Sequence, residues 1–115
     1  MTSTALSGLI RVVRQRSEDS RGFFSRFFCA DELTDAGFSR AIAQINHTLT
    51  QRRGAVRGMH FQYPPRSEVK LVSCIRGAVF DVAIDLRRGS PTFLNWHGET
   101  LSADNGCSLL IPEGF

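Results

Sequence analysis

Hydrophobic and polar positions alternate along this chain in short runs, a pattern typical of β-strands. The longest run covers residues 78–86, where Phe80, Val82 and Ile84 share one face. Further runs predict strands at residues 9–13, 21–28, 42–50, 56–61, 69–76, 96–101 and 108–111. Turn residues separate them, as at 17–21 and 88–91, which carry Ser, Asp, Gly and Pro. Short strands divided in this way favour an all-β sandwich or barrel.

One helical signal interrupts the strands. Residues 31–36 open with two acidic residues, Asp31 and Glu32, and stop before Gly37. No repeat, linker or low-complexity stretch divides the chain, which indicates a single domain over residues 1–115. After the strand at 108–111, residues 112–114 predict a turn and Phe115 the start of another strand. We therefore expect a barrel that is incomplete at its C-terminus, truncated before its last strands.

Composition and charge narrow the class of protein. Hydrophobic residues make up 42% and charged residues 22%, which is typical of a globular chain. The net charge is +3, but the arginines are scattered, which favours a small phosphorylated ligand over nucleic acid. No apolar run is long enough to cross a membrane and no secretory segment is present. Cys29, Cys74 and Cys107 form no CxxC pair, so we expect reduced cysteines and a cytoplasmic protein.

Two partial motifs point to one kind of barrel. Gly54 precedes His60 with five residues between them, and Gly106 precedes residues 112–114 in the same way. These spacings resemble the first and second signatures of cupins, and they predict a cupin-type jelly-roll barrel. Gln62 stands where the first signature carries a second metal-binding His, and Gln is a poor ligand. We therefore expect no metal, with a metal cupin of altered ligands as an alternative.

The stretch Arg57-Gly58-Met59-His60-Phe61-Gln62 is the most informative. Together with residues 19–24, 44–47, 79–87, 89–93, 101–103 and 111–115, it resembles the dTDP-4-dehydrorhamnose 3,5-epimerase family. The resemblance implies an isomerase of deoxysugar (dTDP-rhamnose-like) biosynthesis that inverts carbons 3 and 5 of a dTDP-linked 4-keto-6-deoxy sugar. The ketone of such a sugar acidifies both protons, so a base, a cation beside the enolate and an acid suffice, and we expect no cofactor.

The resemblance also implies roles for single residues. His60 matches the family's base, and an imidazole ordinarily titrates near pH 6.5, which suits proton abstraction. Lys70 matches the lysine near the sugar, where its ammonium would stabilise the enolate. The expected substrate-binding residues are Arg21, Phe24, Arg26, Gln44, Asn46 and Arg57. Arg26 departs from the family, which carries a glutamate there, so the charge beside the nucleotide is reversed.

Each of these residues also has a structural interpretation. Lys70 could be a solvated strand lysine, and Arg21 and Arg57 could be ion-pair partners of Asp81 and Asp85. Gln44 and Asn46 could be polar positions on an open sheet face, and Phe24 could belong to a core or an interface. We interpret the other histidines, His47 and His97, as structural.

The resemblance places three further groups downstream of Phe115: the proton-donating tyrosine, the acidic partner of the catalytic histidine and the histidine of the second cupin signature. We therefore expect this chain alone to be inactive as an epimerase. A non-catalytic sugar-nucleotide binding module with a naturally short chain is the alternative. The family is typically dimeric, with an N-terminal strand that crosses to the partner, so we expect a homodimer.

Overall fold

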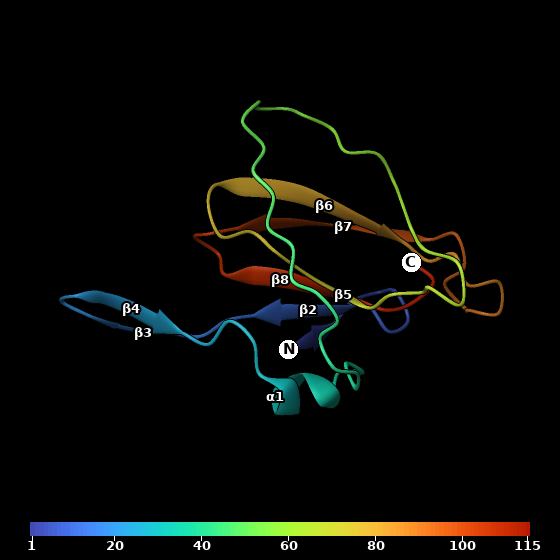
Figure 1. The fold of residues 1–115 in the computed structure, drawn as a ribbon, viewed down its shortest axis with the longest axis horizontal. Helices are drawn as coiled ribbons and strands as arrows, with labels where there is room; N and C mark the ends of the chain where they lie inside the picture. Colours follow the sequence, from blue (N-terminus) through green and yellow to red (C-terminus); the bar gives the residue numbers. More distant parts are fainter.

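The computed structural model describes residues 1–115 and is built from antiparallel strands with one short helix (Figure 1). The strands are β1 (Thr2–Ser3), β2 (Ile10–Val13), β3 (Arg16–Asp19), β4 (Gly22–Ser25), β5 (Lys70–Ser73), β6 (Ala78–Ile84), β7 (Trp96–Ser102) and β8 (Cys107–Ile111), and the helix is α1 (Ala30–Thr34). The predicted all-β class is therefore confirmed. The strands do not close into a barrel, because they form one four-stranded sheet and two separate two-stranded sheets.

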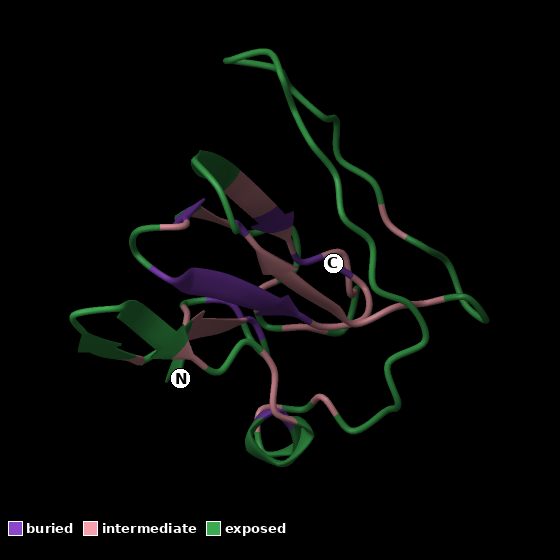
Figure 2. Cartoon of the chain, turned by 60° about the vertical axis from the view of Figure 1, so that its left-hand side comes forward, coloured by how far each residue is buried: buried purple, intermediate pink, exposed green.

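Strand β8 lies inside the main sheet, whose order is β1-β2-β8-β5. All of its residues are buried, and it lies at the centre of the molecule in Figure 2. Cys107, Leu109 and Ile111 belong to the hydrophobic core. Ser108 points the other way, where its hydroxyl lies 2.8 Å from that of Ser73 on β5. Since successive strand residues alternate, the sheet has an inner face on the core and an outer face on the Ser108 side.

The hairpin of β6 and β7 covers the inner face as a second layer (Figure 1). Its ladder pairs Val79 with Leu101 and Ala83 with His97. Leu101 is fully buried and Ala83 nearly so, which shows that this side of the hairpin faces the main sheet. The core between the layers consists of Leu6, Leu9, Cys74, Ala83, Leu101, Cys107, Leu109, Ile111 and Phe115. Burial of each large member stabilises this packing by about 1.5–3 kcal/mol.

The hairpin of β3 and β4 projects from the body of the molecule (Figure 1). The strand predicted at 21–28 is confirmed over Gly22–Ser25 only. Residues 17–19, predicted as part of a turn, lie in β3 instead, and the chain reverses between Asp19 and Gly22. A two-stranded ribbon has no layer to pack against, so Phe24 on β4 is 73% exposed.

The strands predicted at 42–50 and 56–61 are wrong. Residues 41–69 contain no strand and form a long, largely exposed excursion, drawn in green in Figure 2. Their backbone hydrogen bonds are confined to two turns, from Ala55 N–H to Arg52 C=O and from Arg66 N–H to Tyr63 C=O. Alternation shows that a segment can serve as a strand, but a strand forms only where a neighbouring edge pairs with it. No strand of this chain pairs with residues 41–69.

The helix α1 was predicted at 31–36 and is confirmed at Ala30–Thr34, with Asp31 and Glu32 in its first turn. Its single buried residue is Leu33, which anchors it to the rest of the structure. No helix in the structure has the length and apolar character needed to cross a membrane.

The turn after β8 yields a test of the packing. Gly114 has a φ of +85°, and a Cβ added there would lie 2.5 Å from Cγ of Arg87. Gly114→Ala is therefore expected to destabilise the fold by about 2–4 kcal/mol, from left-handed backbone strain and overpacking together. Urea unfolding measures the change. Gly89→Ala is the control, because no atom lies within 4 Å of its added Cβ, and an equal loss there would contradict this explanation.

Candidate active site

Lys70 enters the space between the two layers from β5. It shares a face of that strand with Val72, which packs against the core, so the strand directs both side chains to the inner face. The side chain of Lys70 is 24% exposed, and its Nζ lies 3.1 Å from Oε1 of Glu68. Lys70, which the sequence analysis predicts to lie near the sugar, is therefore a cation that lines the space between the two layers.

Asp81 meets this region from the opposite layer. It lies on β6 on the same face as buried Ala83. Its Oδ2 is buried and accepts no hydrogen bond. Burial raises the pKa of the Asp81 carboxyl, while the positive charge of Lys70 acts in the opposite direction.

Glu99 and His97 complete the polar lining of this interior, and the sequence analysis missed Glu99. Asp81 pairs with Glu99 across the β6–β7 ladder. The Oε2 atom of Glu99 lies 3.3 Å from Nε of Arg11 and 3.3 Å from Nε2 of His97. The available signal was the alternation of His97, Glu99 and Leu101, which places two polar side chains on the face of a core residue.

His60 lies on the excursion 41–69 and is exposed. Its Nδ1 is 3.3 Å from the carbonyl oxygen of Gly58, a local contact that leaves Nε2 free. The structure thus places Lys70 and Asp81 on facing inner surfaces, with His60 on the excursion that leads into β5. A base and a cation placed together can deprotonate a carbon next to a carbonyl and stabilise the enolate.

Three predicted substrate-binding residues lie on the same excursion. Gln44 and Asn46 are exposed, without the strand that was expected to align them on one face. Arg57 donates a hydrogen bond from Nη2 to Oγ1 of Thr50 at 3.3 Å. The binding roles of all three residues remain predictions.

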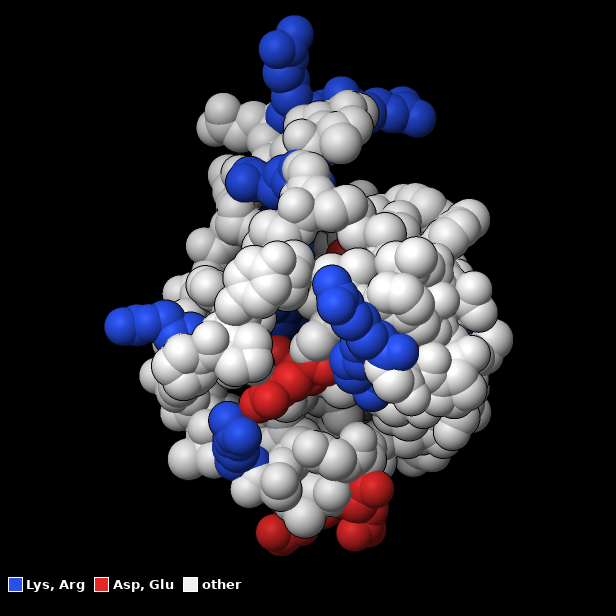
Figure 3. All heavy atoms as spheres, turned by 90° about the vertical axis from the view of Figure 1, so that its right-hand side faces the viewer, with Lys and Arg blue, Asp and Glu red and all other residues white.

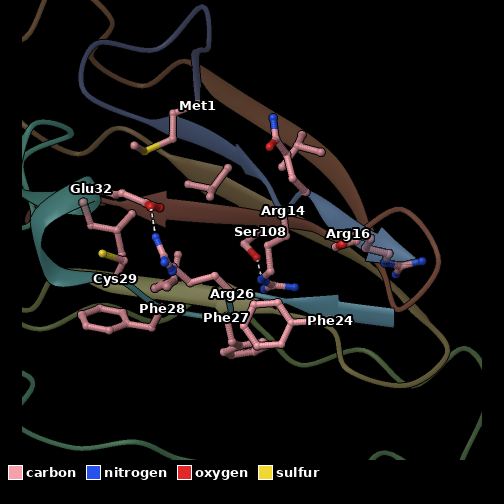
Figure 4. Close-up of a pocket in the computed structure, with 16 residues that line it drawn as sticks. Met1, Arg14, Arg16, Phe24, Arg26, Phe27, Phe28, Cys29, Glu32 and Ser108 are labelled. Atoms are coloured by element: carbon pink, nitrogen blue, oxygen red, sulfur yellow. Dashed lines mark hydrogen bonds and ion pairs between the residues drawn. The ribbon is translucent and has the colours of Figure 1, made fainter. Parts of the chain in front are cut away.

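The other three lie on or beside the β3–β4 hairpin. Arg21 is paired with Asp19, with Nη2 2.7 Å from Oδ2, and Arg26 is paired with Glu32, with Nη1 2.5 Å from Oε1. Phe24 and Arg26 line a cavity of about 470 Å³ beside α1 (Figure 4). Their binding roles likewise remain predictions.

That cavity lies on the outer face of the main sheet. Leu71 and Ser108, both outer-face residues, belong to its lining, and Arg14 donates hydrogen bonds from Nη2 to the hydroxyls of Ser73 and Ser108. The guanidinium of Arg14 stacks 4.1 Å from the ring centroid of Phe27. Within one chain, the sheet therefore separates the hairpin residues from Lys70, because residues 70 and 71 point to opposite faces.

The charges in this structure are mixed. Figure 3 shows acidic side chains in a hollow of one face, with Lys and Arg side chains around it. No group of three or more His, Cys, Asp or Glu side chains is arranged to hold a metal ion.

Comparison with known proteins gives a consistent result. The model of the family described as dTDP-4-dehydrorhamnose 3,5-epimerase matches residues 3–115. A protein of that name from Sinorhizobium fredii is 42% identical over 107 residues, which are 92% of this chain and 55% of the relative. One from Shigella flexneri is 46% identical over 98 residues, which are 84% of this chain and 54% of the relative. The chain thus spans about half the length of these curated relatives.

Solved structures agree with the predicted fold. The dTDP-4-dehydrorhamnose 3,5-epimerase of Bacillus anthracis, with TDP and pyrophosphate bound, superposes with a TM-score of 0.92 at 37% identity, over 97% of this chain and 64% of that one. A dTDP-6-deoxy-D-glucose-3,5-epimerase from Legionella pneumophila, in complex with dTDP-4-keto-L-rhamnose, gives a TM-score of 0.89 at 39% identity, over 97% and 59%. These likenesses confirm the predicted cupin-type class.

Proposed function

Because the chain belongs to the dTDP-4-dehydrorhamnose 3,5-epimerase family, we propose that it serves an isomerase that inverts carbons 3 and 5 of a dTDP-linked 4-keto-6-deoxy sugar. The observation that best supports this is the Lys70 ammonium on the inner face of the main sheet, opposite the layer that carries the buried carboxylate of Asp81. The Legionella relative was solved with a keto-sugar nucleotide of this kind, which supports the choice of substrate.

In this proposal His60 is the base. Its imidazole removes the proton from carbon 3 or carbon 5, which the neighbouring ketone acidifies. The electron pair moves onto the ketone oxygen as an enolate, and the ammonium of Lys70 stabilises the developing negative charge. Inversion follows when a proton returns to the opposite face of the same carbon. The sugar's own carbonyl delocalises the charge, so the proposed reaction requires no redox step and no cofactor.

Substrate binding is proposed for the remaining predicted residues. The guanidinium of Arg57 would meet the sugar or the diphosphate, and that of Arg21 would contact the nucleotide. The amides of Gln44 and Asn46 would meet the base edge of the nucleotide. Phe24 and Arg26 lie on the far side of the main sheet from Lys70. We therefore propose a homodimer, in which the hairpin of one copy carries Arg21, Phe24 and Arg26 to the nucleotide bound by the other.

A cytoplasmic location belongs to the same proposal. The three cysteines are free, and two of them, Cys74 and Cys107, are buried, which suits a reducing compartment.

Solvent deuterium exchange tests the proposed reaction. The intact gene product is incubated in D2O with a dTDP-4-keto-6-deoxy sugar, and deuterium at carbons 3 and 5 is followed by NMR. We expect incorporation at both carbons, and inhibition by added thymidine diphosphate serves as the control. Exchange at carbon 3 alone would indicate a single epimerisation. Binding of thymidine diphosphate without any exchange would replace the epimerase with the sugar-nucleotide binding module.

A further inference from the structure

We infer that Asp81 is a positioning residue: its buried carboxylate attracts the Lys70 ammonium, which is paired with Glu68 in this structure, toward the space between the two sheet layers. This inference rests on the proposed function, because Lys70 is the cation that would stabilise the enolate. Asp81 itself is not assigned to proton transfer.

The first support is the unused acceptor of Asp81. Its Oδ2 is buried and has no hydrogen-bond donor. An ionised carboxylate in such a place is costly unless a cation or a hydrogen-bond donor compensates it. The positive charge that acts on it most strongly is that of Lys70. The empty acceptor and the nearby ammonium are therefore complementary.

The second support is the direction of the two strands. Lys70 and Val72 lie on the inner face of β5, and Asp81 and Ala83 lie on the face of β6 that covers it. In Figure 1, β6 and β7 form the layer over β5 and β8. The Lys70 side chain therefore extends toward the layer that carries Asp81, and its four-carbon stem lets the ammonium turn toward either carboxylate.

The third support is the absence of another free carboxylate on the inner faces. Glu99 stands opposite Asp81 in the ladder, but its Oε2 is already engaged by Arg11 and His97. Glu68, which now holds the ammonium at 3.1 Å, has a side chain that is 37% exposed. An ion pair with an exposed partner is weakened by water, whereas the field of a buried carboxylate is screened less. Asp81 is therefore the acceptor that can hold the ammonium inward.

The position of the Lys70 ammonium determines how well it can stabilise the enolate. Held toward Asp81, the ammonium stays in the interior, where the enolate oxygen would form. Drawn to Glu68, it moves toward solvent and contributes less in the transition state. The effect of Asp81 should therefore appear in kcat more than in KM, because it concerns charge that develops during the reaction.

The test uses Asp81→Asn in the intact gene product. We expect kcat for exchange to fall about tenfold, a loss of about 1.4 kcal/mol of transition-state stabilisation, with KM little changed. The melting temperature should change little, because Asn matches the side chain in shape and Lys70 keeps Glu68 as its counter-ion; a residue with only a structural role would lower it. In a Lys70→Gln background, Asp81→Asn should cause no further loss of kcat.

A second measurement is independent of activity. Lys70 is the only lysine in residues 1–115, so the rate of its acylation can be followed by mass spectrometry of a single peptide. Asp81→Asn should speed acylation, since the amine moves outward, and Glu68→Gln should slow it, since the amine moves inward. Equal rates in the wild type and both variants would overturn the inference.

The outcomes separate the two proposals. Suppose that the wild type exchanges deuterium. If Asp81→Asn then leaves kcat unchanged, or lowers kcat by the same factor in the wild type and in the Lys70→Gln background, the positioning role is wrong and the proposed epimerase activity stands. If the wild type exchanges nothing, the proposed function fails. The acylation rates then still decide whether Asp81 holds Lys70.

Discussion

Replacing His60 with Asn is expected to reduce deuterium exchange at carbons 3 and 5 by about 10²–10⁴-fold, the usual contribution of a positioned general base. Asn keeps a similar polar shape but has no group that accepts a proton from carbon near neutral pH. The loss should fall on kcat and on kcat/KM together, because the interaction removed exists only in the transition state. The assay is the same NMR experiment in D2O.

Stability separates this chemical effect from a folding defect. The imidazole of His60 is exposed and makes only the local contact with the carbonyl of Gly58, so its loss should leave the melting temperature almost unchanged. His47→Asn is the matched control, because His47 is exposed on the same strand-free excursion. Unchanged exchange in the His60 variant would remove its role as the base. Equal loss in both variants would point to a general effect on the excursion.

Replacing Asp85 with Ala is expected to lower the free energy of unfolding by about 3–5 kcal/mol, the cost of breaking a buried ion pair on one side. Asp85 is fully buried. Its carboxylate accepts hydrogen bonds from Nε and Nη2 of Arg87 at 2.8 and 2.7 Å. It also accepts from the hydroxyls of Ser90 and Thr92 at 2.5 and 2.6 Å. Without it, the Arg87 guanidinium loses its counter-ion beside Phe115 and the loop after β6 loses its internal anchor.

Urea unfolding measures this loss, and pH dependence identifies its cause. The hydrogen bonds from Arg87 hold the pKa of Asp85 well below its usual range. The stabilisation is therefore complete above the unfolded-state pKa of about 3.9 and is lost as the pH falls below it toward the folded-state value. Asp85→Ala should abolish this part of the acid sensitivity. Exposed Asp104 provides the control, whose replacement with Ala should change stability by less than about 0.5 kcal/mol. An equal loss there would contradict a specific role for Asp85.

Asp85 also shows where sequence analysis reached its limit. The alternation at residues 78–86 correctly predicted a strand, confirmed as β6. It gave no reason to bury Asp85, because an acidic residue at the end of a strand is usually solvated. Its partners Arg87, Ser90 and Thr92 follow within one loop, but only the folded loop turns all three toward the carboxylate.

Whether the other predicted strands formed depended on pairing with a neighbouring strand. Strands β7 and β8 were predicted nearly to the residue, because each has a neighbour along its full length. The segment 42–50 alternates equally well but joins no ladder, and the local pattern carries no information on whether a segment is paired. For the site, the motif resemblance predicts His60 and Lys70, and their roles stay predictions. The sequence analysis interprets Asp81 only as an ion-pair partner of an arginine, because the packing of β6 over β5 is not visible in either strand alone.

The position of β8 between β2 and β5 has a consequence for the integrity of the chain. The long exposed excursion 41–69 divides the sequence into an N-terminal part that supplies β2 and a C-terminal part that supplies β5 and β8. These parts are joined side by side by the ladder of Ile10–Val13 with Cys107–Leu110. A protease that cuts the excursion would break the polypeptide without opening the sheet. The molecule is therefore built as two complementary fragments, held together by backbone hydrogen bonds and a shared core.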